Sequence, residues 1–399
     1  MDESLIDEWL PSHHFGEHAT DVIRVAEALK TSATQRDRDG GTAWRERDVL
    51  RESGLLKLAV PREFGGFDAG WPLILRTVRR LAVEDSSLAH LFGFQHLQVA
   101  SVRLFGNPEQ QARYLGGTTE QGWFWGNAVN ARDVRLSITR TSTGYELNGI
   151  KSFCSGATGS DMLIISVTSG DAPTDRRFLA IPTQRQGITV NDDWDNIGQR
   201  QTDSGSITFD RVALDASEVL GPPGVASSPR ATLRNLIGQL ILTEIYLGNA
   251  LGAFRDAIGY VKNRSRPWPM AAVANARDDE LLQFRTGGLW PRLKAAQLLA
   301  DDALHEFERA WQRGLDLSAH ARGELALNIA AARLQAARTA LDTTSEIFEL
   351  MGASATTRRD GFDRYWRNVR VHTLHDPLDY RQKSIGQWLL TGQLPDPYG

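Results

Sequence analysis

The chain has 399 residues, of which 41% are hydrophobic and 24% charged, and its formal net charge at pH 7 is −4, as expected for an ordinary globular protein of several domains. The slight acidic excess argues against nucleic acid or an anionic membrane surface as the main partner. Cys154 is the single cysteine, so an internal disulfide framework is excluded, and the lack of a signal-peptide pattern at the N-terminus also predicts a cytoplasmic protein.

The first part of the chain, from Leu5 to about Tyr114, is predicted to be helical because its apolar residues recur every three to four positions. Asp85 can cap a helix over residues 88–104 that ends before Gly106. Within this helix His90 stands among apolar residues, where a buried imidazole usually bonds a backbone carbonyl. We expect an N-terminal helical domain over residues 1–121.

From about residue 122 to 220 the apolar residues form short alternating runs, separated by turn signals such as Asn148-Gly149 and Ser169-Gly170. Roughly six to eight such runs predict a middle β-barrel or sandwich domain over residues 122–228. Helical periods then return and predict helices over 231–262, 283–312, 323–351 and 379–391, with a bend or a later start at Pro291. Long helices with short connections predict a C-terminal four-helix bundle over residues 229–399, so the fold class is α+β.

The segment Tyr365–Pro377 places His372 and His375 three residues apart and next to Asp376. Pro377 should end any helix that runs into it. A helix end with two imidazoles can present a proton donor to a pocket; the alternative is a solvated helix terminus, where a cation complements the dipole. No metal site is expected, because no cysteine or glutamate is clustered with the two histidines.

Two short segments of the middle domain suit a flat ligand. The segment 153–157 follows a short β run and consists mostly of small residues, so a ligand can approach its backbone. The Ser155 hydroxyl can bond a ring nitrogen, and Asn127 can read the edge of a heterocycle. Strand packing and a turn are the alternatives for these two residues. Cys154 lacks an activating base and is predicted to be a small buried residue.

In this α–β–α order, several segments resemble the acyl-CoA dehydrogenase family, in particular its flavin-dependent monooxygenase branch, whose members oxygenate dibenzothiophene and indoles. The resembling segments lie in collinear order over nearly the whole chain, at residues 60–66, 90–93, 126–128, 148–151, 153–157, 191–194, 200–206, 266–268 and 361–377. The resemblance implies a flavin between the β domain and the bundle.

The resemblance also implies how the isoalloxazine ring is held. Ser155 would lie at the N5 side of the ring, with Asn127, Phe153 and Trp194 around it. Phe94 stands in the pocket where a tyrosine is expected, so one hydroxyl is missing there. The segment 129–134 is shorter than its counterpart beside the substrate.

The flavin phosphate and the reacting oxygen involve other residues. Arg266 would reach the phosphate across a subunit interface, and Ser354 follows a Gly-Ala pair near that phosphate, where an arginine is expected. His90 and His375, with His372 nearby, would face the oxygen bound to the flavin. A histidine with an ordinary pKa could supply a proton there at neutral pH.

The implied activity is that of a two-component monooxygenase, which uses a reduced flavin, FADH2 or FMNH2, and O2 to oxygenate a substrate through a C4a-hydroperoxyflavin. The substrate would be a small aromatic heterocycle, such as an indole-type or dibenzothiophene-like compound. No Rossmann or P-loop glycine motif is present, so we expect a separate NAD(P)H:flavin reductase. The family also implies a homotetramer.

Two rival hypotheses remain at this point. Acyl-CoA dehydrogenases carry a catalytic glutamate in the C-terminal loop, where this chain has Leu374-His375-Asp376-Pro377, so the protein could be such a dehydrogenase with Asp376 as a shorter base. It could also be a flavin-free helical assembly protein that kept the fold.

Overall fold

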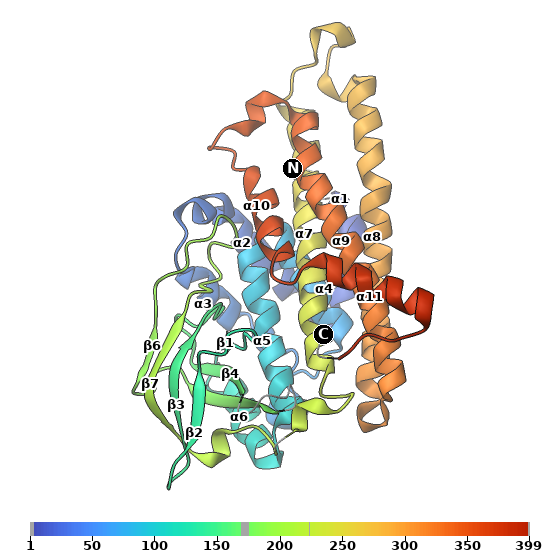
Figure 1. Cartoon of the computed structure of the whole chain (residues 1–399). Coiled ribbons are helices and arrows are strands. Elements are labelled where there is room, and N and C mark those ends of the chain that lie inside the picture. The colour runs from blue at the N-terminus through green and yellow to red at the C-terminus, as the bar shows by residue number, and fades with distance from the viewer. Residues whose placement is uncertain (1–3, 169–174, 223, 398–399) are drawn as a thin grey trace.

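The structure, a computed structural model, describes residues 4–168, 175–222 and 224–397. Helices come first, strands follow, and long helices complete the chain (Figure 1), so the predicted α+β order is confirmed. The turn predicted at Ser169-Gly170 lies outside the described residues. The division into domains after residues 121 and 228 stays a prediction.

The N-terminal part of the described chain is built of helices. They are α1 (Ser4–Trp9), α2 (Ala19–Asp39), α3 (Trp44–Glu52), α4 (Trp71–Glu84), α5 (Ser86–Phe105) and α6 (Pro108–Glu120). Helix α5 begins where predicted, because the Asp85 carboxylate accepts a hydrogen bond from the Leu88 N–H at 3.0 Å. It is buried on nearly all sides because it packs on α4, on the bundle helix α7 and on strand β1.

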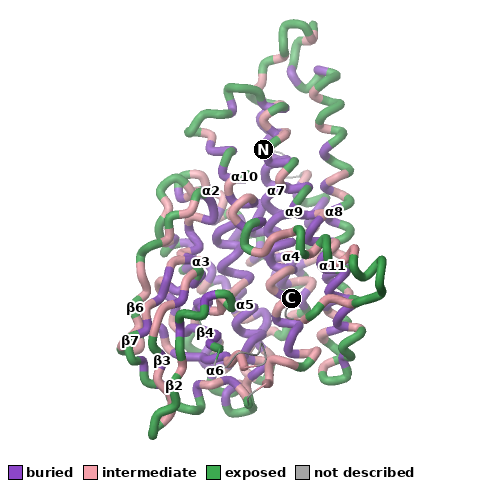
Figure 2. The backbone as a smooth tube through the Cα atoms, in the orientation of Figure 1, coloured by how far each residue is buried: buried purple, intermediate pink, exposed green. Residues whose placement is uncertain are grey.

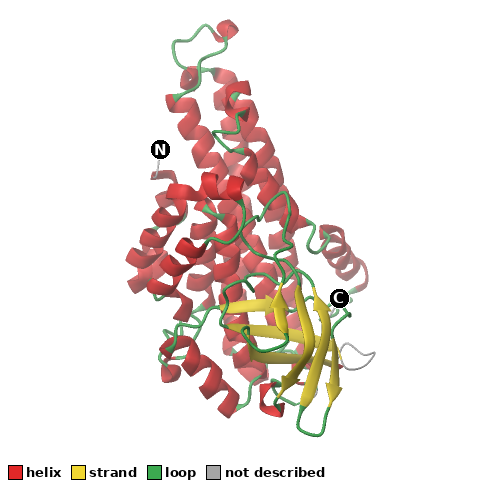
Figure 3. Ribbon diagram, turned by 90° about the vertical axis from the view of Figure 1, so that its left-hand side faces the viewer, coloured by secondary structure: helices red, strands yellow, loops and turns green. Residues whose placement is uncertain are grey.

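The seven strands in the described residues form two sheets that face each other (Figure 3). One sheet has the order β1-β4-β5, with β1 (Trp125–Ala128) parallel to β4 (Met162–Thr168) and β5 (Arg176–Pro182) antiparallel to it. The other is antiparallel in the order β2-β3-β7-β6, with β2 at Ser137–Arg140, β3 at Tyr145–Lys151, β7 at Ile207–Leu214 and β6 at Ile188–Val190.

Strand β4 is buried on both faces, and its residues alternate between two cores. Leu163 and Ile165 face the core between the two sheets, whereas Met162 and Ile164 join the large core of the helices. The three-stranded sheet is therefore the layer that fastens the β sandwich to the helices.

The bundle consists of α7 (Leu233–Asn263), α8 (Glu280–Gln312), α9 (Ala319–Met351), α10 (Asp363–Thr373) and α11 (Leu378–Thr391). Helix α8 continues through Pro291, so the later start expected there is wrong. Gly287, whose carbonyl loses its partner at Pro291, is exposed, so water can bind that carbonyl.

Helix α7 is a central helix that packs on α4, α5 and α9. A Cβ at Gly248 or Gly252 would lie 2.2 Å from a carbonyl oxygen of α4, so glycine permits this close approach. Among the described helices α7 alone is long and apolar enough to cross a membrane, but 89% of its apolar window is buried inside the protein. Figure 2 shows this buried centre and the exposed outer helices α8 and α11.

Candidate active site

Helices α5 and α10 bring two histidines from distant parts of the sequence into contact. The rings of His90 and His372 stack with centroids 4.9 Å apart, and His90 also stacks on Phe94 at 4.0 Å. His90 and His372 are each only 5% exposed. A solvated helix terminus is therefore wrong for His372. His375, which follows the end of α10, is exposed.

These imidazoles are poorly satisfied by the protein itself. Within the described chain, both ring nitrogens of His90 and the Nδ1 of His372 lack a hydrogen-bond partner. The expected bond from His90 to a backbone carbonyl is therefore absent. Buried nitrogens of this kind usually meet a ligand or an ordered water.

Burial also decides the charge of the cluster. It lowers the pKa of His90 to about 3, and the neighbouring His375 acts in the same direction. The pKa of His372 is lowered by burial and then by His90. The pKa of His375 is also lowered, because the protein around its ring desolvates it even though part of the residue reaches the surface, and then because Arg333 lies near. The expectation of an ordinary histidine pKa was wrong. At neutral pH the rings are uncharged, and each can donate one N–H and accept at its other nitrogen.

Asp376, beside His375, is held by two arginines. Its Oδ2 accepts hydrogen bonds from Arg333 Nη1 at 2.8 Å and from Arg381 Nη2 at 2.7 Å. Burial by itself would raise the pKa of Asp376, but the two guanidiniums hold this pKa below its usual value. A carboxylate so paired is a weak base and a good anchor for the loop that carries His375.

The Ser155 hydroxyl belongs to a short chain of hydroxyl groups. Its Oγ lies 2.8 Å from Ser204 Oγ, which lies 2.8 Å from Thr202 Oγ1, and Thr202 in turn donates to the Gln199 carbonyl at 2.9 Å. The three hydroxyls are buried. Because a hydroxyl can rotate its proton, Thr202 can turn its proton from the Gln199 carbonyl to Ser204, which lets Ser204 donate to Ser155 and Ser155 donate to a ligand.

Two aromatic side chains flank this hydroxyl chain. Phe153 is 55% exposed although it precedes a buried segment, and its backbone has a φ of 58°, which is unusual for a residue other than glycine. Its ring meets the ring of Trp194 edge to face at 6.1 Å. The indole N–H of Trp194 donates to the Gln199 carbonyl at 2.9 Å, which fixes its orientation. An exposed ring held in a strained backbone is typical of a ligand-binding surface.

Asn127 lies on β1 and is 8% exposed. Its Oδ1 accepts a hydrogen bond from Gln98 Nε2 of α5 at 3.0 Å, and this bond leaves the Asn127 amide donors for a ligand. Gln98 was not predicted as a site residue. A polar residue amid the apolar run of α5 was the one available signal.

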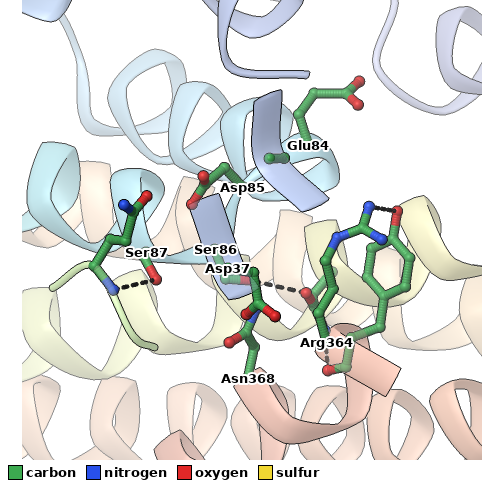
Figure 4. Close-up of a pocket in the computed structure, with 11 residues that line it drawn as sticks. Asp37, Glu84, Asp85, Ser86, Ser87, Arg364 and Asn368 are labelled. Carbon is green, nitrogen blue, oxygen red and sulfur yellow. Dashed lines mark hydrogen bonds between the residues drawn. The ribbon is translucent and has the colours of Figure 1, made fainter. Parts of the chain in front are cut away.

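A polar junction of all three parts of the chain holds the loop that carries Ser204. The loop residue Gln199 donates its N–H to Asn368 Oδ1 of α10 at 2.7 Å, and Gln201 contacts Ser87 of α5. Asn249 of α7 joins them by bonding Ser86 and the backbone of α10. Ser86, Ser87, Gln201, Asn249 and Asn368 line a cavity too small for an organic ligand, and Figure 4 labels Ser86, Ser87 and Asn368 among the groups around it. The junction therefore positions the site and is not itself the site.

Arg266 and Ser354 lie apart from these groups. Arg266 follows α7 at the end of the bundle remote from the sheets (Figure 1), is exposed, and has no ion pair or hydrogen bond within the described chain. Ser354 is exposed and bonds Tyr260 at 2.8 Å. One chain thus presents the ring-binding groups and the phosphate-binding candidates on different parts of its surface.

Two remaining predictions concern cysteine and metal. Cys154 is buried, and burial raises the pKa of its thiol to about 12, so it is the inert residue that was predicted. Across residues 4–168, 175–222 and 224–397 no group of three side chains could hold a metal ion.

The donors fit an isoalloxazine ring. They are neutral hydroxyl, amide and imidazole groups beside exposed aromatic faces, which suits a flat heterocycle with nitrogen and oxygen atoms at its edge. The unpartnered nitrogens of His90 and His372 and the exposed ring of Phe153 are the features that a bound flavin would use.

Family comparisons cover almost the whole chain. The N-terminal, middle and C-terminal domains of acyl-CoA dehydrogenase match residues 20–121, 117–212 and 240–380. The chain is 45% identical to the probable FMNH2-dependent monooxygenase SfnC of Pseudomonas putida, with 94% of each chain covered. It is 41% identical to dibenzothiophene monooxygenase of Rhodococcus qingshengii, with 94% of this chain and 93% of that protein covered.

Solved structures agree. Methanesulfinate monooxygenase MsuC of Pseudomonas fluorescens has a TM-score of 0.92 at 44% identity, with 95% of this chain and 99% of that chain covered. The complex of TdsC from Paenibacillus sp. A11-2 with FMN and indole has a TM-score of 0.91 at 37% identity, with the same coverage.

Proposed function

Since the chain belongs to the acyl-CoA dehydrogenase family, in its flavin-dependent monooxygenase branch, we propose that it oxygenates a small aromatic or sulfur-containing compound with reduced FMN and O2. The FMNH2-dependent relative and the FMN-bound TdsC structure favour FMN over FAD. Indole-type and dibenzothiophene-like compounds are the first substrates to test, because relatives bind or oxygenate them.

Bound reduced FMN supplies the electrons that let one atom of O2 pass to the substrate while the other leaves as water. The protein's residues hold and orient the reactants. Ser155 would donate a hydrogen bond to the flavin ring at its N5 side, and Asn127 would bond the ring edge. Phe153 and Trp194, whose rings meet edge to face, would give the ring an apolar contact surface, and Phe94 stacks on His90.

The three histidines act as neutral hydrogen-bond donors at the place where oxygen reacts. The observation that carries the proposal is that His90 and His372 are buried, stacked and unsatisfied in the described residues. A neutral N–H can hold an oxygen atom without releasing a proton early, and the dry surroundings slow the loss of oxygen as hydrogen peroxide. His375 is exposed, so it is the histidine of the three that a substrate can reach from solvent.

The acyl-CoA dehydrogenase alternative requires Asp376 as a free base. Its ion pairs with Arg333 and Arg381 oppose this role, because a carboxylate that accepts three charged hydrogen bonds is a poor proton acceptor. A flavin-free assembly protein would have no use for a buried, unsatisfied histidine pair.

We propose a homotetramer in which Arg266 of one chain binds the flavin phosphate of another. In support, α11 has no buried residue in the single chain, and α8 and α11 expose large apolar side chains. These are Leu281, Phe284, Trp290, Leu298, Leu299, Tyr380, Trp388, Leu389 and Leu390. Such exposure is typical of subunit interfaces. A separate NAD(P)H:flavin reductase in the cytoplasm would supply the reduced FMN.

The test mixes the protein with anaerobically reduced FMN and then with oxygenated buffer, with and without indole or dibenzothiophene. We expect the protein to slow flavin reoxidation and to form an oxygenated product in place of hydrogen peroxide. Reoxidation at the rate of free FMN, with no product from either compound or from an added sulfinate, would refute the proposal.

A further inference from the structure

Arg234, in the first turn of α7, differs from most of the other buried arginines. Seven of the other eight form an ion pair with a carboxylate, namely Arg36, Arg47, Arg79, Arg80, Arg255, Arg333 and Arg364. The eighth, Arg322, donates to Thr232 and to the Pro397 carbonyl. Arg234 is 7% exposed and has no carboxylate within ion-pair distance among the described residues.

The partners of Arg234 are all neutral. Its Nε donates to Ser101 Oγ at 2.6 Å and its Nη2 to Gln98 Oε1 at 3.1 Å, and the guanidinium lies 5.2 Å from the centre of the Phe178 ring. Its Nη1 has no hydrogen bond in the described part of the chain. One edge of a nearly buried cation is thus left without a partner.

The charge is costly where it lies. Burial, and then the neighbouring Arg176, lower the pKa of Arg234 to about 9, so the group still carries its proton at pH 7. The start of a 31-residue helix adds a partial positive charge at the same place. A buried cation without an anion is strongly destabilising, and an anionic ligand would offset that cost.

Arg234 is connected to the candidate active site by two hydrogen bonds. Gln98 accepts from Arg234 through its Oε1 and donates through its Nε2 to Asn127 Oδ1 at 3.0 Å. The amide orientation of Gln98 is therefore fixed from both sides, and a ligand that contacts Asn127 lies close to the guanidinium.

The backbone of α7 is not crowded one turn beyond Arg234. Gly238 lies one turn further along the same face of α7, and a Cβ there would meet only Leu97 Cδ2, at 4.0 Å. At Gly248, further along this helix, a Cβ would lie 2.2 Å from a backbone oxygen. Gly238 is also only partly buried, whereas most of α7 is buried. A side chain would thus fit at Gly238 without a clash, but not at Gly248.

We infer that the guanidinium of Arg234 binds the anionic group of the substrate, which is a small organic acid with two terminal oxygens, a sulfinate or a carboxylate. The free Nη1 and the shared Nη2 suit a two-oxygen anion, and the apolar part of the acid would lie in the space at Gly238. The inference rests on the proposed function and narrows its substrates to those that carry an acidic group.

The test measures equilibrium binding to the protein loaded with oxidised FMN, so that no turnover is needed. The probes are benzenesulfinate and methyl phenyl sulfone, which share the phenyl ring and the two sulfur-bound oxygens but differ in charge. We expect the sulfinate to bind at least about tenfold more tightly, as for a charge-assisted hydrogen bond. Benzoate in a parallel titration distinguishes a carboxylate site from a sulfinate site.

Arg234→Gln should abolish the preference for the anion, and Arg234→Lys should keep part of it. Arg230→Gln, which removes a partly exposed cation just before α7, should leave the preference unchanged. Gly238→Leu adds a helix-favouring residue and should block both probes if Arg234→Gln does not fold. No preference for the anion in the unaltered protein, or the same preference in Arg234→Gln, would overturn the inference.

The two proposals can fail separately. If reduced FMN reoxidises as in free solution but the anion preference depends on Arg234, the proposed monooxygenase activity is refuted and the proposed anion site is supported. If neutral heterocycles are oxygenated equally well by the unaltered protein and by Arg234→Gln, and the sulfinate shows no preference, the anion site falls and the monooxygenase stands.

Discussion

Replacing Arg333 by methionine should show how the loop that carries His375 is held. Arg333 donates to Asp376 Oδ2 at 2.8 Å and to the Asp376 carbonyl at 3.3 Å, and its side chain is 1% exposed. The substitution removes both bonds at once from a residue adjacent to His375. We therefore expect a loss of stability together with a loss of coupling between O2 consumption and product.

The size of the stability loss depends on the partners that Asp376 keeps in Arg333→Met. Breaking a fully buried ion pair costs about 3–5 kcal/mol. Asp376 keeps Arg381 as a partner and is 16% exposed, so we expect a loss of about 2–3 kcal/mol, at or below the lower end of that range. Arg333→Lys retains the charge and should lose less, because lysine cannot bond the carboxylate and the carbonyl together.

Urea denaturation measures the stability, and the ratio of hydrogen peroxide to product measures the coupling. Arg333→Met should raise the peroxide fraction several-fold with little change in KM, because the substrate contacts are untouched. Arg338→Gln is the control, since Arg338 lies on the same helix and bonds Gln382 of α11 but not the histidine loop. A stability loss below about 1 kcal/mol, or unchanged coupling in Arg333→Met, would refute the anchoring role.

Three further predictions concern the histidines and the flavin wall. Burial lowers the pKa of His96 to about 3. Between pH 6.5 and 3 the unfolded chain therefore binds a proton at His96 that the folded chain does not. The free energy of unfolding should then fall by about 1.4 kcal/mol for each pH unit by which the pH decreases. In His96→Leu, urea titrations at pH 7 and 5.5 should show a shallower decline, and an unaltered slope would contradict this. Phe153→Gly should raise the free energy of unfolding by about 1 kcal/mol, because glycine relieves the positive φ. The same substitution should weaken FMN binding in a fluorescence titration. Tighter FMN binding would contradict the proposed contact between Phe153 and the flavin ring. Ser155→Ala should weaken FMN binding by about tenfold, as for one lost hydrogen bond, and equal affinity would exclude Ser155 from the ring.

Much of the site could be anticipated from local sequence. Helical periods and the Asp85 cap placed α5, and the resemblance over collinear segments indicated the family, the flavin and the ring-binding segments. These features depend on residues close together in the chain, and periodicity and short motifs report such neighbours directly.

The charge of the histidines could not be read in the same way. Their pKa values depend on burial by helices from both ends of the chain, and no local pattern states how deeply a side chain will lie. For this reason His90 and His372 were expected with ordinary pKa values, and the structure makes them neutral.

The sequence by itself determined the α–β–α order and the segments that carry His90, Ser155 and His375. Only the tertiary structure decided which groups are in contact. It stacks His90 on His372, pairs Arg333 with Asp376, and places Arg234 beside Ser101, with no described carboxylate within ion-pair distance. The reason is physical, because an arginine in a helical pattern looks the same whether its partner is an anion or a serine. The partner is supplied by packing between distant helices.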